Sequence, residues 1–132
     1  MKRPDFLTLD DLLALHADRI ERFGGATGLR DPAALLSALA MPAASFGGRF
    51  LHPTLPEMAA AYVFQVSQAQ AFVDGNKRAG LAAALAFLWL NGHELICDTD
   101  SLHDLVLGVA AGERSKSDVA VFFARHVRRL AR

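Results

Sequence analysis

The longest apolar run in the chain, LAAALAFLWL at residues 81–90, limits what this sequence can fold into. We expect it to belong to a helix from about Lys77 to Leu90, with apolar side chains on nearly every side. A helix of this kind needs other helices around it. The ten residues are too few for a membrane span, which takes about 20. The run therefore predicts a central, buried helix in a bundle.

Capping signals predict further helices before and after this run. A Ser, Thr, Asp or Asn at a helix start accepts a hydrogen bond from a free backbone N–H, and a proline fits the first turn. Such residues precede apolar side chains at helical spacing, and Gly24, Gly25 and Pro42 supply stop signals. The expected helices follow the caps Thr8, Asp31, Ser101 and Ser115, and another runs roughly from Pro56 to Ala69.

The stretch ASFGGRFLHPTLP, residues 44–56, breaks the helical pattern. Its two glycines, two prolines and two phenylalanines predict either an irregular loop or a short hairpin near Phe46–Phe50. No other strands are expected, and the last helix is expected to carry Val127 and Leu130. A chain of 132 residues can form one domain with a real core. We therefore expect one all-α domain, residues 1–132, with about six helices around a buried central helix.

Charge and cysteine content exclude several classes of function. Fourteen basic residues balance fourteen acidic ones, so the net charge favours neither nucleic acid nor a membrane as partner. The arginines near the C-terminus suit a helix end, where the helix dipole stabilises cations. A single cysteine, Cys97, excludes an internal disulfide and a cysteine-rich zinc site. The N-terminus MKRPDFLTLDD lacks the apolar core of a signal peptide, so a cytoplasmic protein is expected.

The residues DGNKR, Asp74 to Arg78, stand directly before the apolar run. Lys77 and Arg78 would lie at the positive end of the helix dipole, where each costs about 0.3–1 kcal/mol unless an anion such as phosphate binds there. Asp74 is a natural Mg²⁺ ligand beside phosphate, and Gly75 lets the backbone approach a ligand. Asn76 can donate to phosphate or brace the loop. Spacing alone leaves an alternative open, an ordinary helix start capped by Asp74 or Asn76.

The motif FVDGNKR, residues 72–78, resembles the signature of the Fic/Doc superfamily, in particular its Doc branch of toxins from toxin–antitoxin modules. A second stretch, FGGATGLRDPAALLSAL at residues 23–39, resembles the N-terminal block of Doc-like proteins. The usual motif is His-x-Phe-x-(Asp/Asn)-(Gly/Ala)-Asn-Lys-Arg, and the resemblance covers nearly the whole chain. It favours a phosphate site over an ordinary capped helix. It also implies a Fic/Doc-like bundle in which residues 45–55 form a flap that positions a target segment.

The resemblance implies a reaction as well. Doc-like proteins with lysine at the position of Lys77 are taken to transfer the γ-phosphate of ATP to a Ser/Thr hydroxyl of a protein, in the known case a translation elongation factor. Members with glycine there mostly transfer AMP. ATP and Mg²⁺ are therefore the implied cofactors. Asp74 would hold Mg²⁺, Asn76, Lys77 and Arg78 would cradle the phosphates, and Gly75 would permit the anion hole. Asp74, Lys77 and Arg78 thereby become candidate catalytic residues.

The histidine of the usual motif falls at Gln70 in this chain. That histidine accepts the proton of the attacking hydroxyl, whereas glutamine can hydrogen-bond but accepts no proton near neutral pH. General base catalysis contributes about 10²–10⁴-fold to a rate, so we expect reduced activity. A compensating base is not favoured. His52 and His93 are expected at the surface or at a helix end, and the other histidines are expected in structural roles within helices: His16, His103 and His126.

Two alternatives to phosphate transfer stay open. One is a catalytically silent Doc fold that binds nucleotide or another protein, favoured by Gln70 and by Ala79, where threonine is common in the family. The other is AMP transfer, against which Lys77 argues because it occupies space that a phosphate would need.

A separate antitoxin, lying as a peptide in a groove, is the expected partner besides the protein target. Self-inhibited Fic proteins carry a Ser/Thr-x-x-x-Glu-Gly/Asn helix, whereas none of the four glutamates here precedes Gly or Asn. No direct nucleic-acid binding and no membrane association are expected.

Overall fold

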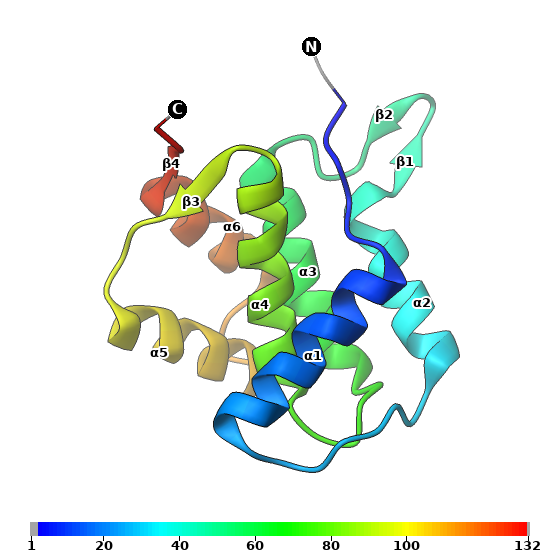
Figure 1. Ribbon diagram of the computed structural model, residues 1–132. Coiled ribbons are helices and arrows are strands. Elements are labelled where there is room, and N and C mark those ends of the chain that lie inside the picture. Colours follow the sequence, from blue (N-terminus) through cyan, green and yellow to red (C-terminus); the bar gives the residue numbers. More distant parts are fainter. Residues whose placement is uncertain (1–2, 132) are drawn as a thin grey trace.

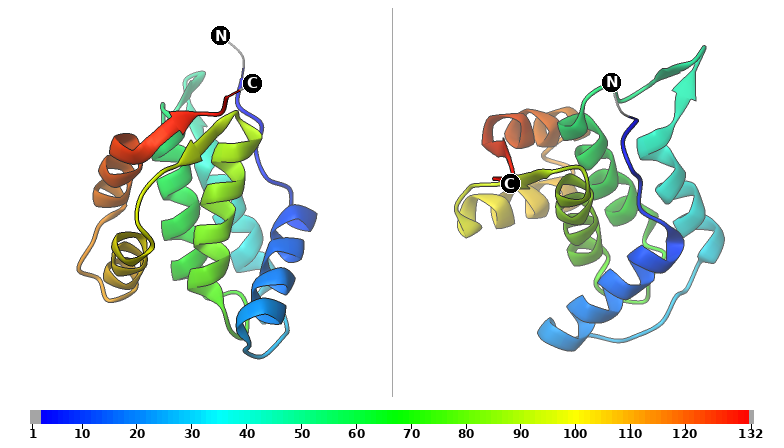
Figure 2. Two further views of the ribbon diagram at one scale, coloured as in Figure 1. Left: turned by 60° about the vertical axis from the view of Figure 1, so that its left-hand side comes forward. Right: turned by 45° about the horizontal axis from the view of Figure 1, so that its top comes forward.

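The computed structural model describes residues 3–131, which form a helical bundle (Figure 1). Within this range there are six α-helices: α1 (Leu9–Phe23), α2 (Pro32–Ala40), α3 (Leu55–Ala69), α4 (Asn76–Leu90), α5 (Thr99–Ala110) and α6 (Lys116–His126). A short 3₁₀ turn, η1 (Met41–Ala43), follows α2. Helices α3 and α4 lie side by side in the middle, with α1 against α4 and with α2 and α6 against α3 (Figure 2). The predicted all-α bundle is confirmed.

Local capping explains where most of these helices begin. Thr8 and Asp11 form a reciprocal capping box at α1, and Ser115 and Asp118 form one at α6, as expected. Asp31 caps α2, with Pro32 as its first residue. The expected cap of α5 is wrong, because Asp98 and not Ser101 stands at its start. The chain offers several capping residues in a row here, and the carboxylate of Asp98 accepts both the backbone N–H and the hydroxyl of Ser101.

The core is centred on α3 and α4. Helix α3 buries eight residues: Met58, Ala59, Ala60, Ala61, Tyr62, Val63, Val66 and Ser67. Helix α4 faces it with small side chains and with Gly80, where a Cβ would lie 2.7 Å from Ser67 Oγ and 2.9 Å from the Val63 carbonyl oxygen. Helix α4 thus shares the centre with α3, although its last turn exposes Trp89. This close contact holds the start of α4 against the end of α3.

Two short antiparallel strand pairs complete the described fold. β1 (Ser45–Phe46) pairs with β2 (Arg49–Phe50) around two glycines with positive φ, so the hairpin alternative is correct. β3 (His93–Leu95) pairs with β4 (Val127–Arg129), which the sequence did not indicate. The last helix therefore stops at His126 and does not include Leu130. Pairing with β3, together with an ion pair between Arg128 and Glu94, stabilises the extended backbone instead.

A search of the described helices for a membrane-spanning segment finds none of sufficient length and apolarity.

Candidate functional site

The loop between α3 and α4, residues 70–75, is clamped by the segment that follows α1. Helix α3 ends at Ala69 and is followed by its C-cap Gln70, whose φ of 47° is the one positive value among the described non-glycine residues. The backbone N–H groups of Arg30 and Asp31 both donate to the Ala71 carbonyl, at 2.7 and 2.9 Å. The Arg30 guanidinium donates to the Gln70 carbonyl. The Val73 N–H also donates to the Gly28 carbonyl at 3.0 Å, so the two sequence stretches that carry the family resemblance are bound to each other.

Phe72 anchors this loop in the core. Its side chain is buried and stacks on the imidazole of His16 in α1, with ring centroids 3.6 Å apart and planes 5° apart. The side chain of Asn76 closes the loop from above. Its Nδ2 donates to the Phe72 carbonyl and its Oδ1 accepts from the Phe72 N–H, both at 3.0 Å. Of the two roles considered for Asn76, the structure shows the bracing of the loop.

Asp74 presents an exposed carboxylate at the turn into α4. Its Oδ2 accepts from the Ala26 N–H at 3.1 Å and its Oδ1 from the Gly75 N–H at 2.9 Å. These two hydrogen bonds, with smaller contributions from the charges of Arg78 and His16, hold the pKa of Asp74 below its ordinary value. The group is therefore a carboxylate anion at neutral pH.

The donor set fits Mg²⁺ bound together with a phosphate ligand. Mg²⁺ usually takes one or two protein carboxylates, and completes its octahedron with phosphate oxygens and water. Within residues 3–131 there is no group of three or more His, Cys, Asp or Glu side chains that could hold a metal ion alone. Asp74 can supply one carboxylate, so a cation here depends on oxygens from a bound ligand.

The N-terminus of α4 differs from the other helix starts. Each of the other five α-helices has a side-chain cap, whereas the residue at the N-cap of α4 is Gly75, with φ 75°, and no side chain of the described residues caps this helix. Its first turn carries no acidic residue but does carry Lys77 and Arg78. In the described part of the chain no carboxylate forms an ion pair with either of them. Free N–H groups, the helix dipole and two cations therefore act together on this surface.

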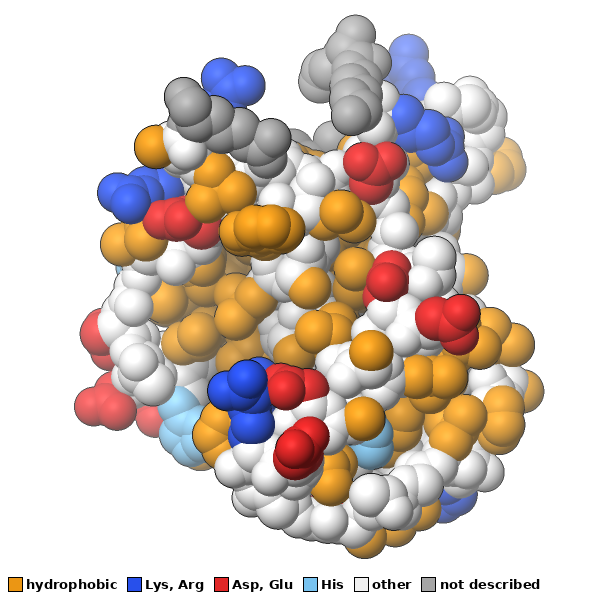
Figure 3. Space-filling view, in the orientation of Figure 1, with side chains coloured by type: hydrophobic (Ala, Val, Ile, Leu, Met, Phe, Trp, Pro, Cys, Tyr) orange, Lys and Arg blue, Asp and Glu red, His pale blue; other side chains and the backbone are white. Residues whose placement is uncertain are grey.

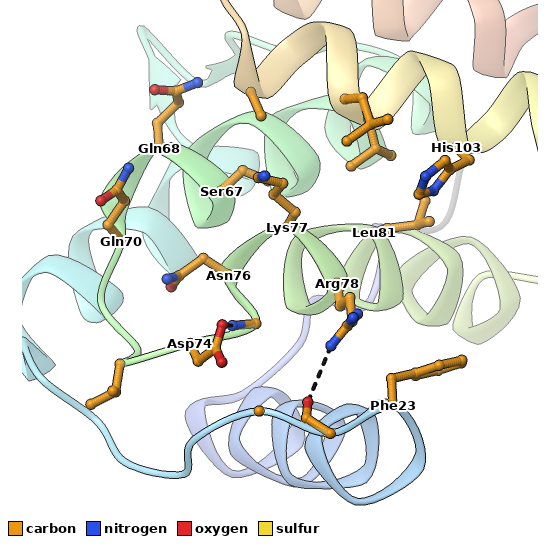
Figure 4. A pocket seen from close by; sticks show the side chains of 17 residues that line it. Phe23, Ser67, Gln68, Gln70, Asp74, Asn76, Lys77, Arg78, Leu81 and His103 are labelled. Carbon is orange, nitrogen blue, oxygen red and sulfur yellow. Dashed lines mark hydrogen bonds between the residues drawn. The ribbon is translucent and has the colours of Figure 1, made fainter.

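A cavity of about 750 Å³ opens onto this surface (Figure 4). Every candidate site residue named from the sequence lines it: Gln70, Asp74, Gly75, Asn76, Lys77 and Arg78. Arg78 also donates to the Gly24 carbonyl at 3.2 Å and lies over the ring of Phe23, which ties α4 to the end of α1. The opposite wall comes from α5.

Other residues at the site were not identified from the sequence. His103 lines the cavity from α5, contrary to the structural role expected for it, because its position depends on how α5 packs. His16 was likewise assigned only to a helix, although its Nε2 lies 2.7 Å from the Asp74 carbonyl oxygen. Ser67 lines the cavity with a buried hydroxyl that has no hydrogen-bond partner among the described residues. For His16 and Ser67, the signal in the sequence was a polar residue among apolar neighbours in a helix, whereas exposed His103 carried no such signal.

The β1–β2 hairpin and His52, which follows it, do not line the cavity. No residue of β1 or β2 is among those that line the cavity, and Figure 1 places the hairpin near the start of α3, whereas the cavity lies at the end of α3. His52 is buried, not at the surface as expected. Burial, and then the charge of Lys116, lowers its pKa. His93 lies in β3 and is also absent from the cavity lining.

Comparison with known proteins identifies the family of this chain. A model of the Fic/DOC family matches residues 6–88. The chain is 36% identical over 111 residues to a protein of Escherichia phage P1 named protein kinase doc, a match that covers 84% of this chain and 86% of the relative. It is 38% identical over 104 residues to a protein of Mycolicibacterium smegmatis named toxin Doc, with 77% and 80% covered. The matched family region contains α1, the clamped loop and most of α4. The chain therefore belongs to the Fic/Doc family, in its Doc-like branch.

Proposed function

We propose that this chain is a Doc-type toxin that binds ATP with Mg²⁺ and transfers phosphate to a Ser/Thr hydroxyl of a protein target. The observation that carries the proposal is the uncapped start of α4, where Lys77 and Arg78 face a cavity beside the carboxylate of Asp74. The names of two relatives, a protein kinase and a toxin, support the same direction.

The electrostatics of α4 favour a polyphosphate ligand. In the ligand-free protein, Lys77 and Arg78 each destabilise the helix start by about 0.3–1 kcal/mol, because they repel the positive end of the dipole. A bound phosphate reverses the sign of that interaction and accepts hydrogen bonds from the free N–H groups. Bound Mg²⁺, held by Asp74 and phosphate oxygens, would neutralise charge that develops on the transferring group. The cavity volume lies within the range usual for small-molecule sites.

Gln70 lowers the rate of phosphate transfer that we expect. Its side chain lines the same cavity as Lys77, so its amide can hydrogen-bond a target hydroxyl and orient it. An amide accepts no proton near neutral pH, and loss of a general base costs about 10²–10⁴-fold. Phosphoryl transfer depends mostly on positioning and charge neutralisation, so slow transfer can persist. A second candidate, a catalytically silent module that binds nucleotide or another protein, is favoured by this same residue.

An antitoxin is the proposed partner that holds the toxin in check. Figure 3 shows hydrophobic side chains gathered in the hollow between α1 and α5, above α4. Trp89 of α4 and Leu107 of α5 are among the large apolar residues left exposed. Leu107 lines the cavity beside the start of α4, and Trp89 lines a separate hollow between α1 and α4. An amphipathic peptide that lies in a groove of this kind would cover exposed apolar side chains. The proposed target, a translation elongation factor, rests on the family resemblance alone.

Labelled ATP separates the candidates. The purified chain is incubated with elongation factor and with ATP labelled at the α or the γ position, as wild type, Gln70→His and Lys77→Ala. We expect slow labelling from γ-labelled ATP only, a faster reaction for Gln70→His and none for Lys77→Ala. Labelling from α-labelled ATP would establish AMP transfer. Equal rates for wild type and Gln70→His would refute the role given to Gln70, and no labelling by either would favour the silent module.

A further inference from the structure

We propose that His16 is a positioning residue for the phosphate site, which it serves by fixing the Asp74–Gly75 peptide from beneath the loop. The part of this inference that concerns nucleotide binding rests on the proposed function. The part that concerns the order of the loop does not. His16 lies on α1, 58 residues before Asp74 in the sequence, and it is not among the residues that line the cavity.

The two sides of one peptide group show how this works. The Asp74 carbonyl can only accept, so His16 Nε2, at 2.7 Å, carries the hydrogen and donates it. The N–H of the same peptide, on Gly75, donates to Asp74 Oδ1 at 2.9 Å. This peptide is trans, so its C=O and N–H point in opposite directions. His16 therefore fixes one side of the plane while the carboxylate that would hold Mg²⁺ is fixed to the other.

The ring of His16 fixes the rest of the loop. It stacks face to face on Phe72, and the backbone of Phe72 is bound at both its N–H and its C=O by Asn76, the first residue of α4. A Cβ at Gly75 would lie 3.5 Å from His16 Nε2 and 3.1 Å from Ile20 Cδ1. One face of α1 thus forms the support on which the left-handed turn at Gly75 rests, and that turn leads into the first residues of α4, which line the cavity.

Packing alone does not call for histidine here. The other buried positions of α1, Leu12 and Ile20, are aliphatic, and His16 is only 5% exposed. A buried imidazole is costly unless its N–H is satisfied, and the acceptor it has is the Asp74 carbonyl. An apolar ring would fill the same space without that requirement. The Nε2–H group of His16 therefore stabilises the loop and is not needed for packing of the core.

Two substitutions separate the ring from the donor. His16→Phe keeps an aromatic ring beside Phe72 and removes the N–H, whereas His16→Gln keeps an N–H at a similar reach and removes the ring. Leu12→Ala, on the same helix and at a fully buried position, is the control for loss of core packing. Amide hydrogen exchange by NMR at Phe72 and Gly75 reports loop order without any ligand. The dissociation constant for Mg·ATP reports the site.

We expect His16→Phe to speed exchange at both amides and to weaken Mg·ATP binding by about 3- to 10-fold, the value of one hydrogen bond. His16→Gln should recover part of both effects. Leu12→Ala should lower the melting temperature but change neither the exchange at these two amides nor the affinity for Mg·ATP.

Unchanged exchange in His16→Phe would overturn the positioning role, as would affinity no weaker than that of Leu12→Ala. If the wild type binds no Mg·ATP, the proposed function fails, while the exchange rates still decide whether His16 orders the loop.

Discussion

Gly80 allows α4 to approach α3 closely, and its replacement by alanine tests that contact. The new Cβ would lie 2.7 Å from Ser67 Oγ and 2.9 Å from the Val63 carbonyl oxygen. The hydroxyl can rotate away, but the carbonyl belongs to the α3 backbone and cannot. Alanine brings a gain of about 1 kcal/mol in helix propensity over glycine. The sign of the net effect therefore decides whether the two backbones are packed as tightly as the structure shows.

Overpacking a tight contact costs about 1–3 kcal/mol. We expect a cost toward the upper end of this range for Gly80→Ala, because the Val63 carbonyl oxygen belongs to the backbone of α3. After the gain in propensity, we expect the free energy of unfolding to fall by about 1–2 kcal/mol. Gly108 in α5 is the matched control. There the three heavy atoms nearest to an added Cβ all belong to the exposed side chain of Arg114, which can move. Gly108→Ala should therefore raise the free energy of unfolding by up to about 1 kcal/mol.

The assay is urea unfolding of wild type and both variants, followed by circular dichroism. The midpoints should shift in opposite directions with an unchanged m value, because neither substitution alters the surface exposed on unfolding. A stabilising effect of Gly80→Ala as large as that of Gly108→Ala would show that α3 and α4 separate at little cost. That result would refute the account of how the start of α4 is held.

Three further predictions concern charge. Lys77→Ala should stabilise the ligand-free protein by about 0.3–1 kcal/mol and so raise its melting temperature. The same substitution should reduce the further rise in melting temperature that Mg·ATP produces. A lower melting temperature of the ligand-free variant would contradict the electrostatic argument. The lowered pKa of Asp74 means that its contribution to stability is present above the ordinary carboxyl pKa, about 4, and is lost as pH falls through the lower folded value. Asp74→Asn should therefore flatten the acid end of the stability profile, and an unchanged slope would count against the two N–H contacts. The pKa of buried His52 is also lowered, so stability is present above its ordinary pKa, about 6.5, and declines below it. His52→Gln should remove that decline, which a persisting slope between about pH 7 and 5 would disprove.

Short-range signals identified most of the fold. Thr8 and Ser115 act on N–H groups only three residues ahead, so their capping boxes can be read from the sequence. The β3–β4 pair could not, because it joins residues more than thirty positions apart and no glycine or proline marks the end of α6. The prediction of the α5 cap was wrong for a different reason, since Asp98 and Ser101 are both good caps and only the folded backbone shows which of them caps the helix.

At the site too, local sequence signals could be recognised, whereas contacts between distant residues could not. The five residues from Asp74 to Arg78 were recognised because they are contiguous and match a family motif. The two histidines near them, His16 and His103, come from other helices and become part of the site only through packing. Asn76 shows a further limit, since its amide could serve a ligand or the loop and only the hydrogen bonds to Phe72 decide.

The central claim is that the start of α4 binds the phosphates of ATP, and NMR titration tests it most directly. Backbone amide shifts of the ¹⁵N-labelled chain are followed as Mg·ATP is added, with Mg²⁺ alone and adenosine alone as controls. The largest changes are expected at Gly75, Asn76, Lys77 and Arg78 with Mg·ATP, and none at these amides with adenosine. Shifts centred elsewhere, or saturation that Lys77→Ala leaves unchanged, would contradict the account.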